Sequence, residues 1–249
     1  MLIDTHCHIH ELSYPLPVND VLSRARHAGV TQILCVGTSE ASSREAVIFA
    51  AKHAGAYASV GVHPHDTKDG WQELLPLASS EKVVAVGEIG LDYFYSHSPR
   101  DIQIKALEEQ IELALKHDLP IIFHVREAFD DFWSIFDNFH GIRGELHSFT
   151  DTSENLEEAL KRGLFIGVNG ISTFTKDIKQ QAMFQHIPID RLLFETDAPF
   201  LTPVPLRGKI NEPAFVRHVA EFHAHHRGIS LEEIAAFTTA NARALFALS

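Results

Sequence analysis

Cysteine and long apolar runs are both scarce in this sequence of 249 residues. The two cysteines, Cys7 and Cys35, each lie inside an apolar run, where a small buried thiol is the ordinary explanation, so no disulfide framework is expected. No stretch approaches the ~20 apolar residues that span a bilayer, and the N-terminus lacks a basic segment followed by an apolar run. We therefore expect a soluble, cytoplasmic protein.

Basic side chains are in the minority, with 21 Lys and Arg against 33 Asp and Glu and a formal charge of -12. This balance excludes a broad cationic surface of the kind that binds duplex DNA by releasing counterions. If the substrate is nucleic acid, cations must supply positive charge locally. With 45% hydrophobic residues and no internal repeat or linker, the chain is expected to form one domain over residues 1–249.

Short runs rich in β-branched residues alternate with segments of helical spacing. Because near-continuous apolar strands separated by helices imply a parallel sheet covered by helices, about eight such units predict an α/β fold, a single-domain TIM-type (β/α)8 barrel. A doubly wound sheet is the runner-up. The predicted strands are residues 2–9, 32–38, 56–63, 83–92, 120–126, 145–150, 164–169 and 191–197; the predicted helices are residues 19–28, 40–53, 102–117, 153–162, 175–186, 214–226 and 231–248.

Histidine is unusually frequent, with 17 residues. Some of these histidines are scattered: His223, His225 and His226 crowd one predicted helix and are expected to face solvent. Others fall at the C-terminal ends of predicted strands, where side chains from different strands of a barrel meet above its core. Scatter would not produce that second arrangement, so these histidines are candidates for function.

Six residues of metal-ligand type fall on five predicted strand ends. His6 and His8 point the same way because side chains alternate along a strand, and two imidazoles on one face make half a metal site. Glu88 follows an apolar run, where a buried carboxylate is costly unless it is paired or metal-bound. The other three are His124, His147 and Asp197. Taken singly, His124 or His147 would more often be a core residue, but jointly the six favour a metal site.

Five short motifs, in an order and spacing that cover essentially the whole chain, resemble those of the TatD family of metal-dependent deoxyribonucleases, a branch of the amidohydrolase-like metallo-hydrolases. They are Asp4-Thr5-His6-Cys7-His8, Gly87-Glu88-Ile89-Gly90-Leu91-Asp92, His124-Val125-Arg126, Glu195-Thr196-Asp197-Ala198-Pro199, and Arg207-Gly208-Lys209 with Asn211-Glu212-Pro213. Two stretches depart from the family pattern. Residues 148–151 (Ser-Phe-Thr-Asp) stand where Cys-Phe-Ser-Gly is common, and Leu206 stands where His is common, so substrate preference is affected more than metal binding.

The resemblance implies a two-metal site that cleaves phosphodiester bonds of DNA, as an exonuclease or DNase, through a water activated by both cations. The expected cofactors are two divalent ions, Zn, Mn or Mg, in each subunit. One ion is expected on His6, His8 and Asp197, the other on His124 and His147, with Glu88 between them. Glu88 and Asp197 are therefore the predicted catalytic residues, with Asp197 as the proton acceptor.

Further side chains are candidates for substrate contact. His63 ends the third predicted strand, and Arg126, Arg207 and Lys209 suit phosphates that flank the one that is cut. Asp92 is predicted to orient a metal-bound histidine. The aromatic residues 93–95 could stack on unpaired bases, which favours single-stranded DNA or DNA ends as the partner, but packing under a loop is an equal alternative.

Two other functions remain open at this point. A hydrolase of a small cyclic amide, ester or lactone would use the same ligand geometry, since related barrels share it. A non-catalytic metal-binding barrel would keep the ligands but would not need a polar mouth, and His63, Arg126 and Lys209 weigh against it. No sequence feature indicates a membrane or a protein partner.

Overall fold

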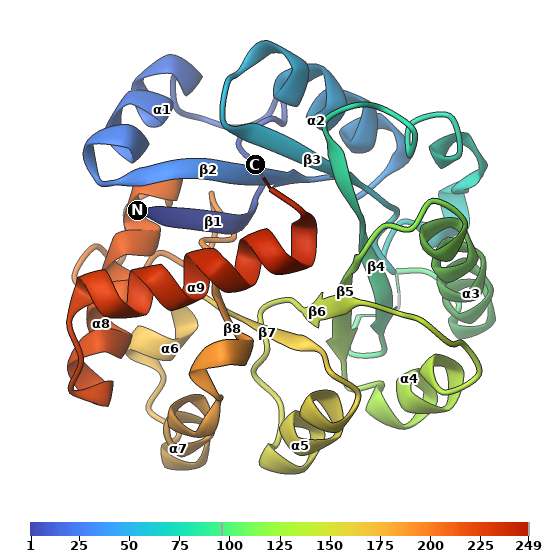
Figure 1. The fold of residues 1–249 in the computed structure, drawn as a ribbon. Coiled ribbons are helices and arrows are strands. Elements are labelled where there is room, and N and C mark those ends of the chain that lie inside the picture. The colour runs from blue at the N-terminus through green and yellow to red at the C-terminus, as the bar shows by residue number, and fades with distance from the viewer. Residues whose placement is uncertain (96, 249) are drawn as a thin grey trace. The chain divides into compact units, whose positions relative to one another are not determined.

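The computed structural model describes residues 1–95 and 97–248, and within them eight strands alternate with helices along the chain (Figure 1). The strands are ordered β1-β2-β3-β4-β5-β6-β7-β8 in one sheet. The pairings β1–β2, β3–β4, β4–β5, β5–β6 and β7–β8 are parallel. Sequential parallel strands joined by helices are the topology of the (β/α)8 barrel, so the predicted fold class is confirmed.

The chain divides into two compact units, one formed by Met1–Cys35 with His147–Ser249 and the other by Val36–Leu146. In the first unit β8 lies beside β1, through a parallel bridge between Cys7 and Ala198. Helix α9 packs against both strands (Figure 1). The elements that begin in this unit are β1 (Leu2–Cys7), α1 (Val18–His27), β2 (Val30–Val36), α5 (Ser153–Lys161), β7 (Phe165–Val168), α6 (Ile171–Phe174), α7 (Ile178–His186), η3 (Ile189–Arg191), β8 (Leu192–Phe194), η4 (Pro213–Phe215), α8 (Val216–Arg227) and α9 (Leu231–Phe246).

The second unit is built around the long strand β4 and its neighbour β5, whose register pairs Gly90 with His124. Gly90 has a φ of 154°, and a Cβ at this position would collide with the backbone carbonyl of His124. Only glycine allows this close approach, which fixes His124 against β4. The elements of this unit are α2 (Glu40–Lys52), β3 (Ala56–Val60), η1 (Thr67–Asp69), η2 (Gln72–Leu74), β4 (Val83–Asp92), α3 (Arg100–Lys116), β5 (Ile121–Arg126), α4 (Phe129–Phe136) and β6 (Gly144–Leu146).

Local sequence sets where several helices begin and end. The side chain of Ser39 caps α2 by accepting a hydrogen bond from the Ser42 N–H, and Thr152, Asp177 and Ser230 accept equivalent bonds at the starts of α5, α7 and α9. Gly228 ends α8 in the left-handed conformation, with φ 66°. The connections thereby return the chain to the next strand at defined positions.

The apolar runs that predicted the strands are buried in both units. Fully buried side chains in the first unit include Ile9, Leu34, Phe194 and Phe246, and those in the second include Leu107, Ile111, Ile121, Phe123 and Phe132. Over the described residues, no helix is both long enough and apolar enough to cross a membrane.

The structure corrects several boundaries. Strands β6 and β8 end at Leu146 and Phe194, earlier than predicted, because Ser148 and Asp197 adopt left-handed backbone angles, with φ 49° and 57°. Helices α4 and α6 lie where no helix was predicted. The expectation that His223 faces solvent is wrong: this residue is 2% exposed, and its Nε2 lies 2.9 Å from the Ser172 Oγ. His225 and His226 are exposed, as expected.

Candidate metal centre

Two histidines and one aspartate converge in the first unit, where β1 and β8 end side by side. The His6 Nε2 lies 3.2 Å from the His8 Nε2. The Asp197 Oδ1 lies 3.3 Å from the His8 Nε2 and 3.8 Å from the His6 Nε2. Donor atoms that share a cation ~2.1 Å away lie about 3.0–3.4 Å apart. Two of the three pairs have this spacing and the His6–Asp197 pair is wider, so the set has the chemistry of a metal site and comes close to its spacing.

The Asp197 carboxyl is held in its ionised form. Burial alone would raise its pKa, but a hydrogen bond from His8 and the proximity of His147 and His6 lower the pKa below its usual value. The backbone fixes the position of Asp197, because the Asp197 N–H donates to the His6 carbonyl at 2.8 Å. A charged carboxylate beside two imidazoles is the form that a divalent cation requires.

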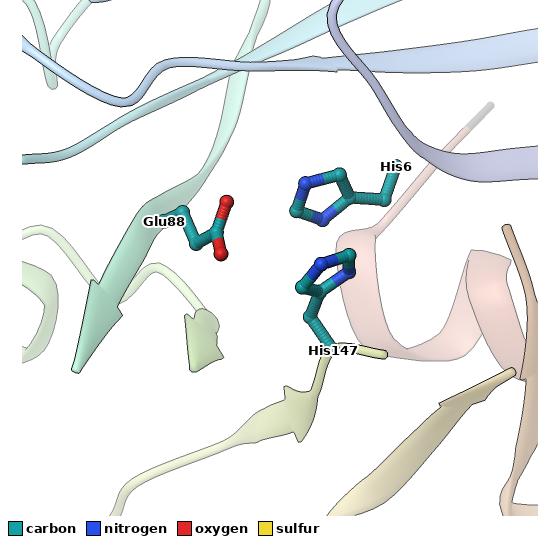
Figure 2. Close-up of side chains that lie close together, drawn as sticks. All are labelled: His6, Glu88 and His147. Atoms are coloured by element: carbon teal, nitrogen blue, oxygen red, sulfur yellow. The ribbon is translucent and has the colours of Figure 1, made fainter. Parts of the chain in front are cut away.

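His147 follows β6 and stacks on His6, with ring centroids 3.5 Å apart and an interplanar angle of 21° (Figure 2). Its Nδ1 lies 3.0 Å from the Glu195 Oε1, and its Nε2 lies 4.0 Å from the Asp197 Oδ1. A carboxylate partner keeps the ring proton on Nδ1, so that the Nε2 lone pair can coordinate a cation. The structure thus brings His147 close to both His6 and Asp197.

Glu195 lies in one of the five family-like motifs, but no role was predicted for it from the sequence. It is fully buried, and its Oε1 accepts hydrogen bonds from the Ser148 N–H at 2.8 Å and the Asn169 Nδ2 at 3.1 Å. The sequence does contain a signal for its position. Side chains two residues apart on a strand share a face, so a carboxylate two residues before Asp197 should face the same side as Asp197. Its contact with His147 makes it an orienting group.

A second buried carboxylate, that of Asp4, secures the turn that carries Asp197. Its Oδ1 accepts from the Thr196 N–H at 2.8 Å, and its Oδ2 accepts from the Thr196 hydroxyl at 2.6 Å. Burial raises the pKa of Asp4 to about 8, although the bonds from Thr196 oppose the shift. The Asn211 Nδ2 donates to the Thr196 carbonyl at 2.8 Å, so the residue before Asp197 is held from three directions.

A second group of donors lies in the other unit and contains His63, Glu88 and His124. Glu88 is 4% exposed on β4 (Figure 2). Its Oε1 lies 2.9 Å from the His124 Nδ1 and 3.5 Å from the His63 Nε2. One ligand atom from each of the three residues lies within 4.8 Å of the others.

His124 and His63 differ in which ring nitrogen is expected to carry the proton. The His124 Nε2 lies 3.0 Å from the Asp92 Oδ2, so the proton is expected there and the Nδ1 lone pair points toward Glu88. The His63 Nδ1 instead accepts from the His65 N–H at 3.2 Å, which places its proton on Nε2, toward Glu88. Burial, with His124 close by, lowers the pKa of His63 well below its usual value. His124 is thereby prepared as a ligand, and His63 as a neutral donor.

Asp92 joins several parts of this unit. Its Oδ2 lies 2.9 Å from the His65 Nε2 as well as 3.0 Å from His124, and its Oδ1 accepts from the backbone N–H groups of Phe94 and Tyr95, each at 3.0 Å. Burial would raise the pKa of Asp92, but the hydrogen bonds, led by that from His124, hold it well below its usual range. Asp92 thus contacts a candidate ligand, and its role in orienting that histidine stays a prediction.

The basic residues predicted to contact substrate are divided between the two units, with Arg126 in the second and Arg207 and Lys209 in the first. Arg126 is exposed, and its guanidinium lies over the Phe94 ring. Arg207 lies over the Phe174 ring, 3.8 Å from its centroid, and donates to the Thr202 carbonyl at 2.7 Å. Lys209 is exposed on the same loop as Arg207.

A (β/α)8 topology with imidazole and carboxylate donors gathered at its strand ends defines a metal-dependent hydrolase. The family model described as TatD related DNase matches residues 3–247. The chain therefore belongs to the TatD related DNase family, and the family inferred from the motifs is confirmed.

Individual relatives agree with this family over the full length. The chain is 40% identical to the uncharacterized metal-dependent hydrolase YabD of Bacillus subtilis (strain 168), and the match covers 100% of both chains. It is 35% identical to the 3'-5' ssDNA/RNA exonuclease TatD of Citrobacter rodentium (strain ICC168), over 93% of this chain and 92% of that one. The crystal structure of the TatD homolog YJJV from Escherichia coli K12 superposes with a TM-score of 0.91 at 29% identity, over 100% of this chain and 98% of that one.

Proposed function

We propose that this protein is a metal-dependent nuclease that hydrolyses phosphodiester bonds in single-stranded nucleic acid, beginning at an end. The observation that carries the proposal is the convergence of ionised and neutral donor atoms at strand ends in each unit: His6, His8 and Asp197 in one, Glu88 and His124 in the other. Relatives named 3'-5' ssDNA/RNA exonuclease, at 35% and 37% identity, support the substrate class.

The proposed metal content is two divalent cations, with Zn, Mn and Mg as candidates. His6, His8 and Asp197 would hold one cation. His124 and His147 would hold the other, and Glu88 would be a ligand of both. The carboxylate partners of His124 and His147 support the proposal, because each lies at one ring nitrogen while the other nitrogen faces a further candidate ligand, Glu88 or Asp197. A mixed set of imidazole and carboxylate donors suits Zn or Mn better than it suits Mg, which prefers oxygen ligands.

When bound, such cations lower the pKa of a water and offset charge that develops on the phosphate. Asp197, held ionised by its histidine neighbours, accepts the proton that the attacking water loses. The His63 Nε2–H donates to Glu88 and fixes the direction of that carboxylate. Arg207 and Lys209 contact phosphates beside the one that is cut, since a guanidinium binds phosphate in a bidentate manner.

The whole chain of residues 1–249 is proposed to act as one barrel domain, and the family match across residues 3–247 supports this. We also propose that it works in the cytoplasm. Cys7 and Cys35 are both buried free thiols, as expected in a reducing compartment.

The test uses protein stripped of metal and reloaded with Mg²⁺, Mn²⁺ or Zn²⁺. Substrates are single-stranded DNA and RNA labelled at either end, the corresponding duplexes, and a panel of cyclic amides and lactones. We expect single nucleotides to be released from single strands, with little hydrolysis of the amides and lactones. Hydrolysis of a lactone or amide in preference to every oligonucleotide would instead establish the alternative hydrolase function.

The variants Glu88→Ala and His6→Ala should each reduce cleavage by at least about 100-fold, because each removes a donor from the site. The matched control is His225→Ala, which removes an exposed histidine from α8. If Glu88→Ala degraded DNA as fast as the wild type does, a contaminating nuclease would explain the activity and the proposal would be rejected.

A further inference from the structure

Two large aromatic side chains are exposed directly after β4, close to the donor group of the second unit. Phe94 is 49% exposed and Tyr95 is 42% exposed. Their rings meet edge to face, with centroids 4.6 Å apart. Exposed aromatic rings beside a candidate active site are typical of a surface that binds a ligand.

A cation lies over the same two rings. The guanidinium carbon of Arg126 is 3.9 Å from the centroid of Phe94 and 5.0 Å from that of Tyr95, and Arg126 itself is exposed. Flat rings with a guanidinium match a nucleotide, because a base stacks on an aromatic face while a phosphate accepts from arginine. A lactone or small cyclic amide that carries no anionic group would not use the guanidinium.

The position of this aromatic loop is tied to the candidate metal ligand. The Asp92 Oδ1 accepts from the N–H groups of Phe94 and Tyr95, and its Oδ2 meets the His124 Nε2. One carboxylate therefore sets both the loop and the imidazole. On its other side Tyr95 lies nearly parallel to the His97 ring, at 16° and 5.5 Å between centroids.

We propose that Phe94, Tyr95 and Arg126 form a subsite for one unpaired base and its phosphate, next to the phosphodiester that is cut. This inference rests on the proposed nuclease function. A base inside a duplex is stacked on its neighbours and cannot reach an aromatic side chain without being unpaired. The subsite therefore selects single strands and frayed ends, and it tolerates any base because every base has a flat face.

The experiment compares two substrates that differ only in their bases. One is a single-stranded thymidine oligonucleotide, and the other has the same backbone but tetrahydrofuran abasic residues throughout. For Phe94→Ala we expect KM on the thymidine strand to rise roughly 5- to 100-fold, the range of one lost base–aromatic stack. On the abasic strand, wild type and Phe94→Ala should agree within about twofold.

Arg126→Ala separates the phosphate contact from the base contact. Because both substrates carry the same phosphates, Arg126→Ala should bind both strands more weakly than the wild type does. Its affinity should also depend less steeply on the salt concentration. The matched control is Phe237→Ala, which removes an aromatic residue on α9 that is 43% exposed. Thermal unfolding of each variant within about 2 °C of the wild type shows that the fold is retained.

A binding measurement gives a second readout that does not depend on cleavage. Wild-type protein stripped of metal should quench the fluorescence of 2-aminopurine near the end of a single strand, and Phe94→Ala should not. Equal KM values for wild type and Phe94→Ala on the thymidine strand, with equal quenching, would overturn the subsite and leave the nuclease function standing. Hydrolysis of neither strand by the wild type would reject the nuclease function itself.

Discussion

Single carboxylates control the state of single imidazoles in this protein. The Asp92 Oδ2 lies 3.0 Å from the His124 Nε2, and the Glu195 Oε1 lies 3.0 Å from the His147 Nδ1. In both cases the carboxylate accepts from a ring N–H, which keeps the proton on that nitrogen while the other nitrogen faces the site. The role of a histidine here depends less on its own burial than on what its second nitrogen meets.

We expect Asp92→Asn to lower metal affinity. An amide in place of the carboxylate no longer fixes the proton on the His124 Nε2, and losing such a partner typically reduces metal affinity ~10- to 100-fold. Calorimetric titration of metal-free protein with Mn²⁺ measures the effect. The control is Asp131→Asn, which alters a carboxylate that accepts from Tyr93 and Arg100 in the same unit. Unchanged Mn²⁺ affinity in Asp92→Asn would refute the orienting role.

His223 predicts a pH dependence of stability. Burial, with Arg227 and His226 nearby, lowers its pKa from 6.5 to about 3. The unfolded chain takes up a proton below pH 6.5 while the folded protein does not, so stability is fully present above pH 6.5 and falls as the pH drops toward 3. At pH 5 this one residue should cost about 2 kcal/mol of unfolding free energy.

Urea unfolding at pH 7 and pH 5 tests this dependence. His223→Gln keeps a donor near Ser172 but does not titrate, so its loss of stability between the two pH values should be smaller than that of the wild type. His226→Gln, on the exposed face of the same helix, should behave like the wild type. A wild type and a His223→Gln variant that lose equal stability would show that other groups carry the dependence.

At the scale of elements, the decisive feature is how the strands end. β8 stops at Phe194, and the next three residues turn so that Asp197 comes beside His6 on β1 and His8 just after it. That turn is fixed by Asp4 and Asn211, both buried, acting on Thr196. The loop after β8 is thus part of the candidate site, because it holds a ligand in place from outside the strand.

Asn211→Ala should lower both stability and metal affinity. It leaves the Thr196 carbonyl without its donor, which costs about 1–3 kcal/mol for a buried acceptor. The matched control is Asn241→Ala, where a buried asparagine on α9 donates to Leu192 and Ile189 at the opposite end of β8. Urea unfolding should show similar losses in the two variants, and Mn²⁺ titration a weakened site only in Asn211→Ala. Equal Mn²⁺ affinity in both would contradict the positioning role.

Sequence pattern predicts the strands well and their ends less well. Alternation along one strand places His6 and His8 on one side, and an apolar run locates Glu88 on β4. The left-handed backbone at Ser148 and Asp197 cannot be read from residue type, because it arises from contacts with Glu195 and with β1. For the same reason the partner of His147 and the burial of His223 escaped sequence reasoning, since each depends on a residue distant in the chain.

At the scale of the whole molecule, an acidic protein is proposed to bind a polyanion. The formal charge of -12 repels nucleic acid at long range, and nothing in the composition offsets it broadly. Binding must therefore come from a few local charges, namely the cations and residues such as Arg126 and Lys209. Affinity for single strands should accordingly be modest and should fall as the salt concentration rises.

Metal removal should lower the stability of the folded protein. His6 and His8 come from the start of the chain and Asp197 from near its end, so a cation that they share cross-links the first unit only when it is folded. A ligand at 100 times its Kd adds about 2.7 kcal/mol to the free energy of unfolding. We expect the Tm to rise by several degrees when Mn²⁺ or Zn²⁺ is added to stripped wild-type protein. The rise should be smaller in His6→Ala, and in His225→Ala it should equal that of the wild type. If the Tm of the wild type did not respond to any divalent cation, the donor groups could not be a metal site.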